Sequence, residues 1–156
     1  MNLLSIDPGA KSGYAIILDG SVAESGEFNI TSGTGAHRIV TILSRARALG
    51  CRMVLEDMGG FRPGISHKVG CACGQFIQEA RELGMEWTWA KPNAWAMDIL
   101  ECKGNTPRAI RKELSRGMAA AHQSAHEVKE NEADAICIGL HVIKQTLAGA
   151  PLKWRK

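Results

Sequence analysis

The sequence has no long apolar stretch and no strong excess of charge of either sign. Its 156 residues are 45% hydrophobic and 22% charged, with a net charge of +3. Without an apolar run of about 20 residues, a membrane span is not expected. Without a basic segment followed by an apolar one near the N-terminus, no secretory signal is expected. Charge this mild does not by itself indicate a nucleic-acid partner. We expect a single domain over residues 1–156, located in the cytoplasm.

Cysteines are odd in number and scattered, which disfavours a disulfide framework and favours a reducing compartment. The five are Cys51, Cys71, Cys73, Cys102 and Cys137. Cys71 and Cys73, with His67 nearby, have the wrong spacing for a zinc finger, and the sequence offers no second ligand pair. A zinc site is therefore not expected.

The apolar pattern predicts elements in the order β-β-β-α-β-α-β-α-α-α. Strands are expected over 3–7, 13–18, 22–30, 53–55 and 86–90, and helices over 36–49, 69–83, 92–100, 107–114 and from near Asn131. The dipeptide Asp19-Gly20 predicts a tight hairpin between the second and third strands. Three strands followed by alternating helices and strands indicate an α/β domain. Its sheet is expected to be mixed, with the first three strands antiparallel and the later ones parallel.

Acidic residues fall at the ends of three of these elements. Asp7 ends the first strand, Glu56 follows the fourth, and Glu130-Asn131-Glu132-Ala133-Asp134 begins the last helix. Neighbouring parallel strands end at one edge of a sheet, so Asp7 and Glu56 are expected side by side, with the helix packed across that edge. Buried carboxylates repel one another unless a cation lies among them. Oxygen ligands suit Mg²⁺ or Mn²⁺ rather than zinc, and two such ions activate water for phosphoryl transfer.

Each of these acids also has a structural interpretation. Asp7-Pro8-Gly9 can form a simple turn, Glu56 can pair with a surface arginine, and Glu132 stabilises the start of any helix through the helix dipole. Asp134 is hardest to explain in this way, because it begins the most apolar part of its helix. Gly9 and Gly13 are expected to let a substrate backbone approach without a Cβ in the way.

The ordered set of motifs resembles the RuvC-type Holliday junction resolvases. Asp7-Pro8-Gly9 with Gly13-Tyr14-Ala15 is similar to that family's first strand and hairpin, Val54-Leu55-Glu56 to its second motif, and Glu132-Ala133-Asp134-Ala135 to its closing acidic motif. The resemblance covers residues 1–147. It implies an RNase H-like fold, in which a five-stranded mixed sheet is flanked by helices on both faces. The short chain resembles a phage or prophage branch of the family.

The resemblance implies a homodimeric crossover junction endodeoxyribonuclease in a bacterial or phage-infected cell. It would nick four-way and other branched DNA symmetrically, leaving 5′-phosphate and 3′-hydroxyl ends. The implied cofactor is Mg²⁺, with Mn²⁺ as a substitute and two ions per site, and no small-molecule cofactor or membrane is involved. The implied catalytic residues are Asp7, Glu56, Glu132 and Asp134, and the implied metal ligands are these four with Asn131. The family commonly has an acid or histidine where this chain has Asn131, so whether Asn131 or Glu132 is the fourth ligand stays open.

Basic and aromatic residues near these motifs are expected to contact DNA. Related resolvases place an aromatic wedge at the junction centre, which makes Phe61 and Arg62 candidates for unstacking a base step and holding a phosphate. The remaining candidates are Lys103, Arg108, Arg111 and Lys112, which would neutralise phosphates in a salt-dependent way. The structural alternatives are a loop anchor for Phe61 and a solvated surface for the basic residues.

Three other functions stay open at this point. Asp-Pro-Gly followed by a glycine also resembles the phosphate loop of sugar-kinase and actin-like ATPases, although those enzymes need two such domains. An RNase H-like nuclease that acts on a flap or an RNA precursor has the same motifs. A junction-binding protein with weak or no catalysis also stays open, because Asn131 supplies no charge to the site.

Overall fold

The computed structural model describes residues 1–57, 67–123 and 125–156. Its strands are β1 Leu3–Asp7, β2 Lys11–Leu18, β3 Ser21–Asn29, β4 Arg52–Glu56 and β5 Trp87–Ala90. Its helices are α1 Gly35–Ala48, α2 His67–Glu82, α3 Pro92–Ile99, α4 Arg108–His122 and α5 Glu130–Leu147. These elements confirm the predicted order.

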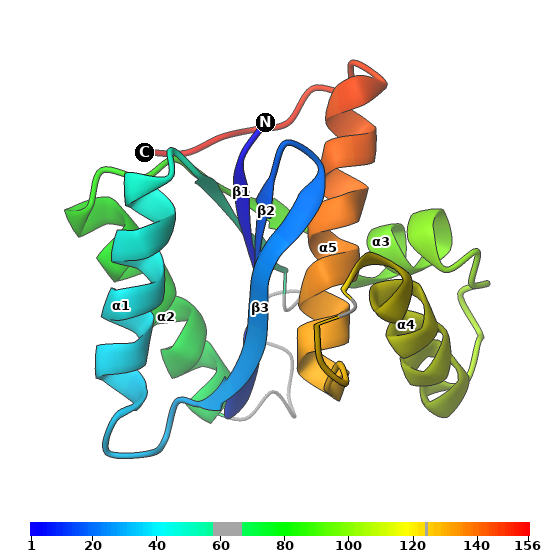
Figure 1. Cartoon of the computed structure of the whole chain (residues 1–156), viewed down its shortest axis with the longest axis horizontal. Coiled ribbons are helices and arrows are strands. Elements are labelled where there is room, and N and C mark those ends of the chain that lie inside the picture. Colours follow the sequence, from blue (N-terminus) through cyan, green and yellow to red (C-terminus); the bar gives the residue numbers. More distant parts are fainter. Residues whose placement is uncertain (58–66, 124) are drawn as a thin grey trace.

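The strands form one five-stranded sheet in the order β3-β2-β1-β4-β5. β2 is antiparallel to both β1 and β3, whereas β1, β4 and β5 run parallel. The predicted mixed sheet is therefore confirmed. Helices α1 and α2 cover one face and α5 crosses the other, with α3 and α4 packed outside α5 (Figure 1).

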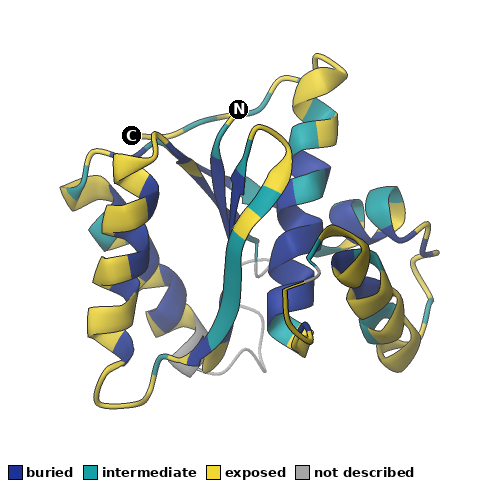
Figure 2. Cartoon of the chain, in the orientation of Figure 1, coloured by how far each residue is buried: buried dark blue, intermediate teal, exposed yellow. Residues whose placement is uncertain are grey.

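A different apolar core packs on each face of the sheet, because successive side chains of a strand point to opposite sides. Leu4 and Ile6 of β1 belong to a large apolar core under α1 and α2. Leu3 lies in a second core under α5 and α3. This alternation turns Asp7 toward α5. Strands β1 and β2 and the middle of α5 are mostly buried, whereas β3 is mostly intermediate in burial (Figure 2).

Helix α5 lies very close to β2, and two glycines make this approach possible. A Cβ on Gly13 would lie 1.8 Å from the backbone oxygen of Asn131, and one on Gly139 would lie 2.4 Å from the Cδ1 of Ile17. The expectation that Gly13 makes room for a substrate is therefore wrong. The first turn of α5 occupies that space.

A β-bulge decides which residues of β3 face α5. The hairpin begins with Leu18 opposite Ser21, but the register shifts by one residue between Ile16 and Ile17. Since a shift of one residue moves side chains to the other face, β3 places Glu27 rather than Gly26 opposite Gly13. Gly13 also lies opposite Asp7 on its other side. Asp7, Gly13 and Glu27 thus form one row across three strands, called here the cross-strand row.

Helix α4 extends beyond the predicted end at 114 and continues to His122. Its Ser115 and Ala119 are fully buried, so small side chains let α4 pack closely beside α5.

The basic C-terminal segment returns to the sheet. The Trp87 N–H donates to the Arg155 oxygen at 2.9 Å, and the Arg155 N–H donates to the Trp87 oxygen at 2.7 Å. The Arg155 guanidinium also lies 5.2 Å from the centre of the Trp87 ring. In the described ranges, no helix is both long enough and apolar enough to cross a bilayer.

Candidate active site

Asp7, Glu56 and Asp134 line one pocket of about 340 Å³ at the carboxyl-end edge of the sheet. Asp7 and Glu56 end the neighbouring parallel strands β1 and β4, and Asp134 comes from the first turns of α5. The other lining residues are Pro8, Gly9, Lys11, Pro92, Trp95, Arg108, Arg111, Lys112 and Asn131. Three acids from separate parts of the chain therefore face one space, and basic residues surround them.

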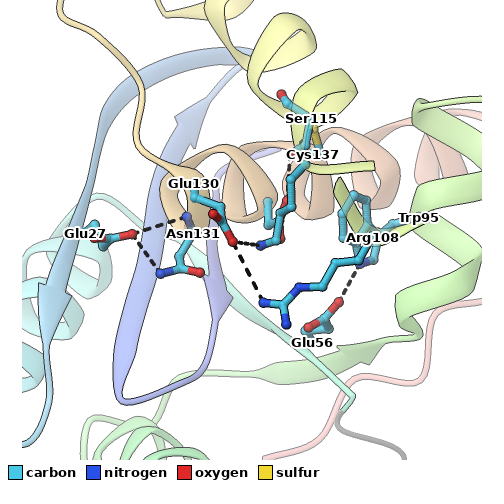
Figure 3. A network of polar contacts seen from close by, with 10 residues as sticks. Glu27, Glu56, Trp95, Arg108, Ser115, Glu130, Asn131 and Cys137 are labelled. Atoms are coloured by element: carbon cyan, nitrogen blue, oxygen red, sulfur yellow. Dashed lines mark hydrogen bonds and ion pairs between the residues drawn. The ribbon is translucent and has the colours of Figure 1, made fainter. Parts of the chain in front are cut away.

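Two of the carboxylates are held by specific donors (Figure 3). The Trp95 Nε1–H on α3 donates to Glu56 Oε1 at 2.8 Å. The Ser115 hydroxyl on α4 donates to Asp134 Oδ1 at 2.6 Å, and Lys112 Nζ donates to Asp134 Oδ2. These contacts fix the Glu56 and Asp134 carboxylates in position. The two side chains are therefore already partly ordered for binding a ligand.

Burial and neighbouring negative charge raise the pKa values of Asp7 and Glu56. Burial, followed by the charges of Glu56 and Asp134, raises the pKa of Asp7 well above its ordinary value. Burial also raises the pKa of Glu56, and the Trp95 hydrogen bond opposes this increase. Like charges in a poorly solvated site behave in this way when the cationic charge available does not balance them. The pocket is therefore electrostatically suited to bind additional positive charge.

Lys112 supplies part of that charge. Its Nζ lies 3.2 Å from Glu130 Oε1 in addition to its contact with Asp134. Burial alone would lower the pKa of Lys112, but Asp134, Asp7 and Glu130 raise it. The amine is therefore held in its charged form. It serves as a counterion for the acids as well as a candidate phosphate contact.

The donor set of the pocket fits Mg²⁺ or Mn²⁺. Three carboxylates and the side-chain carbonyl of Asn131 offer only oxygen ligands, which these hard cations prefer. Over the described ranges, no three His, Cys, Asp or Glu side chains already stand at metal-binding spacing. Lys112 occupies one oxygen of Asp134, so this oxygen could hold a divalent ion only in place of the amine contact.

Asn131 faces the pocket from the start of α5, and a residue outside the predicted set holds it there. Its Nδ2 donates to Glu27 Oε2 at 2.7 Å, and its backbone N–H donates to the same oxygen at 3.3 Å. Lys11 Nζ lies 3.2 Å from Glu27 Oε1. Burial would raise the pKa of Glu27, but the hydrogen bonds from Lys11 and Asn131 lower it below its ordinary value. Glu27 is therefore an ionised acceptor.

Glu132 lies apart from this group. Its buried carboxylate accepts hydrogen bonds from the Ser25 hydroxyl at 2.6 Å and the Lys129 backbone N–H at 3.1 Å. His126 Nε2 lies 2.6 Å from the same oxygen that Ser25 contacts. These partners come from β3 and from the segment before α5, so the structure does not bring Glu132 together with Asp7, Glu56 and Asp134.

The predicted DNA contacts divide into three groups. Arg108, Arg111 and Lys112 line the pocket, and Lys103 is exposed on the loop before α4. The Nε atom of Arg111 is buried and has no hydrogen-bond partner among the described residues. Phe61 and Arg62 lie outside the described residues.

Sequence reasoning missed two residues of the site, Trp95 and Glu27. Trp95 is 5% exposed in the apolar core, and its indole N–H also holds Glu56. Its position in the first turn of the helix after β5 was a usable signal. Glu27 could be found only by anticipating the bulge in β3.

The site lies on an α/β fold of the RNase H-like type, as the sheet order and the acids at its edge indicate. The solved RuvC structure from Thermus thermophilus superimposes with a TM-score of 0.74 at 20% identity, covering 99% of this chain and 100% of that one. A T. thermophilus RuvC in complex with a Holliday junction substrate gives a TM-score of 0.72 at 19% identity, covering 99% of each chain. This likeness shows the fold. No family model and no curated protein matches the sequence.

Proposed function

We propose that this chain is a divalent-metal-dependent endonuclease that resolves four-way and other branched DNA junctions. The observation that carries the proposal is the convergence of Asp7, Glu56 and Asp134 on one pocket rimmed by basic residues. Metal-assisted hydrolysis of a DNA phosphodiester uses this combination, because the metal ions stabilise charge at the reacting oxygens while basic side chains hold the neighbouring phosphates. The fold shared with a RuvC that was solved with a Holliday junction supports the choice of substrate.

The oxygen-bearing side chains of the pocket would form the metal site in this proposal. Asp7, Glu56 and Asp134 would hold Mg²⁺ or Mn²⁺, with the Asn131 carbonyl as the fourth ligand. Two bound ions would activate a water and stabilise the leaving oxygen of the phosphodiester. We leave Glu132 out of the ligand set, because its carboxylate is committed to Ser25, Lys129 and His126.

The basic residues would orient the DNA. Arg111 offers a buried N–H without a described partner, which suits it to a phosphate oxygen at the pocket. The exposed Arg108 lies 3.8 Å from Glu130, a weak contact that a phosphate can replace. Lys112 would leave Asp134 when an ion binds and turn toward the phosphate. Lys103 would contact a DNA phosphate further from the cut. Phe61 and Arg62 stay candidates for unstacking a base step and holding a phosphate at the junction centre.

A homodimer is part of the proposal, because the two-fold symmetry of a four-way junction calls for two copies of the site. Paired cuts by the two sites would leave 5′-phosphate and 3′-hydroxyl ends. Sedimentation of the protein alone and on a junction tests the dimer, and sealing of the products by DNA ligase tests the ends.

The main experiment compares wild type with Asp7→Asn and Asp134→Asn on a four-way junction in Mg²⁺ and in Mn²⁺. We expect paired nicks from the wild type, and intact binding without nicking from both variants. A linear duplex, a flap and an RNA–DNA hybrid are the control substrates. Preference for the flap or hybrid would assign another substrate. A wild type that binds the junction but never nicks it with either ion would contradict the nuclease.

A further inference from the structure

The two ends of the Asn131 amide face different surroundings. Its Nδ2 donates to Glu27 Oε2 at 2.7 Å, and the residue lines the pocket with Asp7 and Asp134. Figure 3 shows the amide nitrogen turned to Glu27 and the amide oxygen turned toward the side of Arg108 and Glu56. No described residue donates a hydrogen bond to this oxygen. The oxygen is therefore available to a ligand.

Glu27 is placed so that only one orientation of this amide is favourable. A carboxylate accepts hydrogen bonds and donates none when ionised, and the nearby Lys11 ammonium keeps Glu27 ionised. The Glu27 side chain is only 7% exposed, so water cannot readily take the place of the Asn131 donor. A flipped amide would set its oxygen against Glu27 Oε2 and turn two N–H donors into the acidic pocket.

The backbone of the sheet also holds Glu27 and Asn131 together. Glu27, Gly13 and Asp7 lie on the cross-strand row, and the missing Cβ of Gly13 lets the Asn131 backbone rest on the sheet. The Asn131 N–H, one of the unpaired donors of the first helical turn, also donates to Glu27 Oε2. Glu27 thus anchors both the helix start and the side chain.

We propose that Glu27 is a positioning residue that fixes the Asn131 amide with its carbonyl oxygen toward the pocket. This inference rests on the proposed function. It explains how an asparagine can serve where a charged or histidine ligand would be expected. The chain keeps an oxygen ligand at 131, and the carboxylate lies one hydrogen bond further out, on β3. Outer partners of this kind fix the geometry of a ligand without touching the ion.

The first test measures Mn²⁺ binding to the full chain by calorimetry, with no DNA present. Glu27→Ala is expected to weaken Mn²⁺ binding about 10–100-fold, as loss of an outer-shell partner does. Glu24→Ala is the matched control, because Glu24 lies on the same strand but contacts Tyr14 and Arg45. It should leave Mn²⁺ binding unchanged. Circular dichroism establishes that each variant is folded.

The second test needs no metal, and it stays decisive if Glu27→Ala unfolds the chain. Asn131→Asp alone sets two carboxylates against each other and should lower Tm near neutral pH. Adding Glu27→Gln should restore it, because the introduced amide can donate to the introduced carboxylate. If Asn131→Asp lowers Tm equally whether residue 27 is glutamate or glutamine, the inference is overturned.

The two proposals fail in different ways. If Asp7→Asn and Asp134→Asn abolish Mn²⁺ binding while Glu27→Ala binds like wild type, only the positioning role of Glu27 is refuted. If Asp7→Asn and Asp134→Asn also bind Mn²⁺ like wild type, the metal-dependent function itself is refuted.

Discussion

Glu132 and Asp134 lie two residues apart at the start of α5, and both are buried. Glu132 is enclosed by Ser25, His126 and Lys129, which satisfy both of its oxygens. Asp134 is held by Ser115 and Lys112 but still lines the pocket. Burial therefore does not distinguish the acid that we propose as a metal ligand from the acid that we leave out of the ligand set. The direction of the side chain and the nature of its partners do.

The sharpest test of this comparison replaces each of the two acids by its uncharged amide and measures both cleavage and stability. Asp134→Asn should lower junction cleavage by more than about 100-fold, the upper range for loss of a mere outer-shell partner. Glu132→Gln should keep cleavage but lose about 1–3 kcal/mol of stability, since it weakens hydrogen bonds to a buried charged group. Gel-based cleavage and thermal melts measure the two effects. Loss of cleavage by a folded Glu132→Gln protein would reverse our assignment.

A substitution at Gly13 should disturb Glu132 and Asp134 together, because the start of α5 rests on Gly13. Gly13→Ala puts a Cβ into the Asn131 backbone and should cost at least about 1–3 kcal/mol, the usual range for overpacking. For a chain of this size, each kcal/mol lowers Tm by about 2–4 °C.

Gly74→Ala on α2 is the control for this change. Nothing lies within 4 Å of a Cβ built there, and alanine favours a helix by up to about 1 kcal/mol, so Tm should rise slightly. A Gly13→Ala protein as stable as wild type would show that α5 can move away from β2.

Trp95→Phe tests the pocket side alone. It keeps most of the buried ring but removes the N–H that holds Glu56. We expect a loss of about tenfold in Mn²⁺ affinity, the lower range for an outer-shell partner. Trp89→Phe, which changes a ring packed 5.4 Å from Trp87, should leave Mn²⁺ affinity unchanged. Equal losses in both variants would indicate a packing effect.

The smallest expected effect concerns the charge of Asp7 in the absence of metal. Its folded-state pKa is raised, so its contribution to stability is full below the unfolded-state pKa and is lost as pH rises through the folded-state value. Asp7→Asn should therefore melt a few degrees above wild type near neutral pH, and the two curves should converge below about pH 4. A difference that does not vary with pH would point to packing instead.

The sequence predicted the sheet and the three acids at its edge, because strand periodicity and strand ends are local signals. It did not predict Glu27, because a two-residue hairpin without a bulge would place Gly26 opposite Gly13. The shift between Ile16 and Ile17 is a property of the paired strands. The Lys112–Asp134 pair was also missed, since it depends on how α4 lies against α5.

The cross-strand row also limits how this fold can vary among related chains. Position 13 has no room for any side chain while α5 rests on β2, so glycine should be invariant there. Positions 27 and 131 share one donor and one acceptor, and they should therefore change together. In an alignment of relatives, an acid at 131 should be accompanied by a hydrogen-bond donor or a small neutral residue at 27.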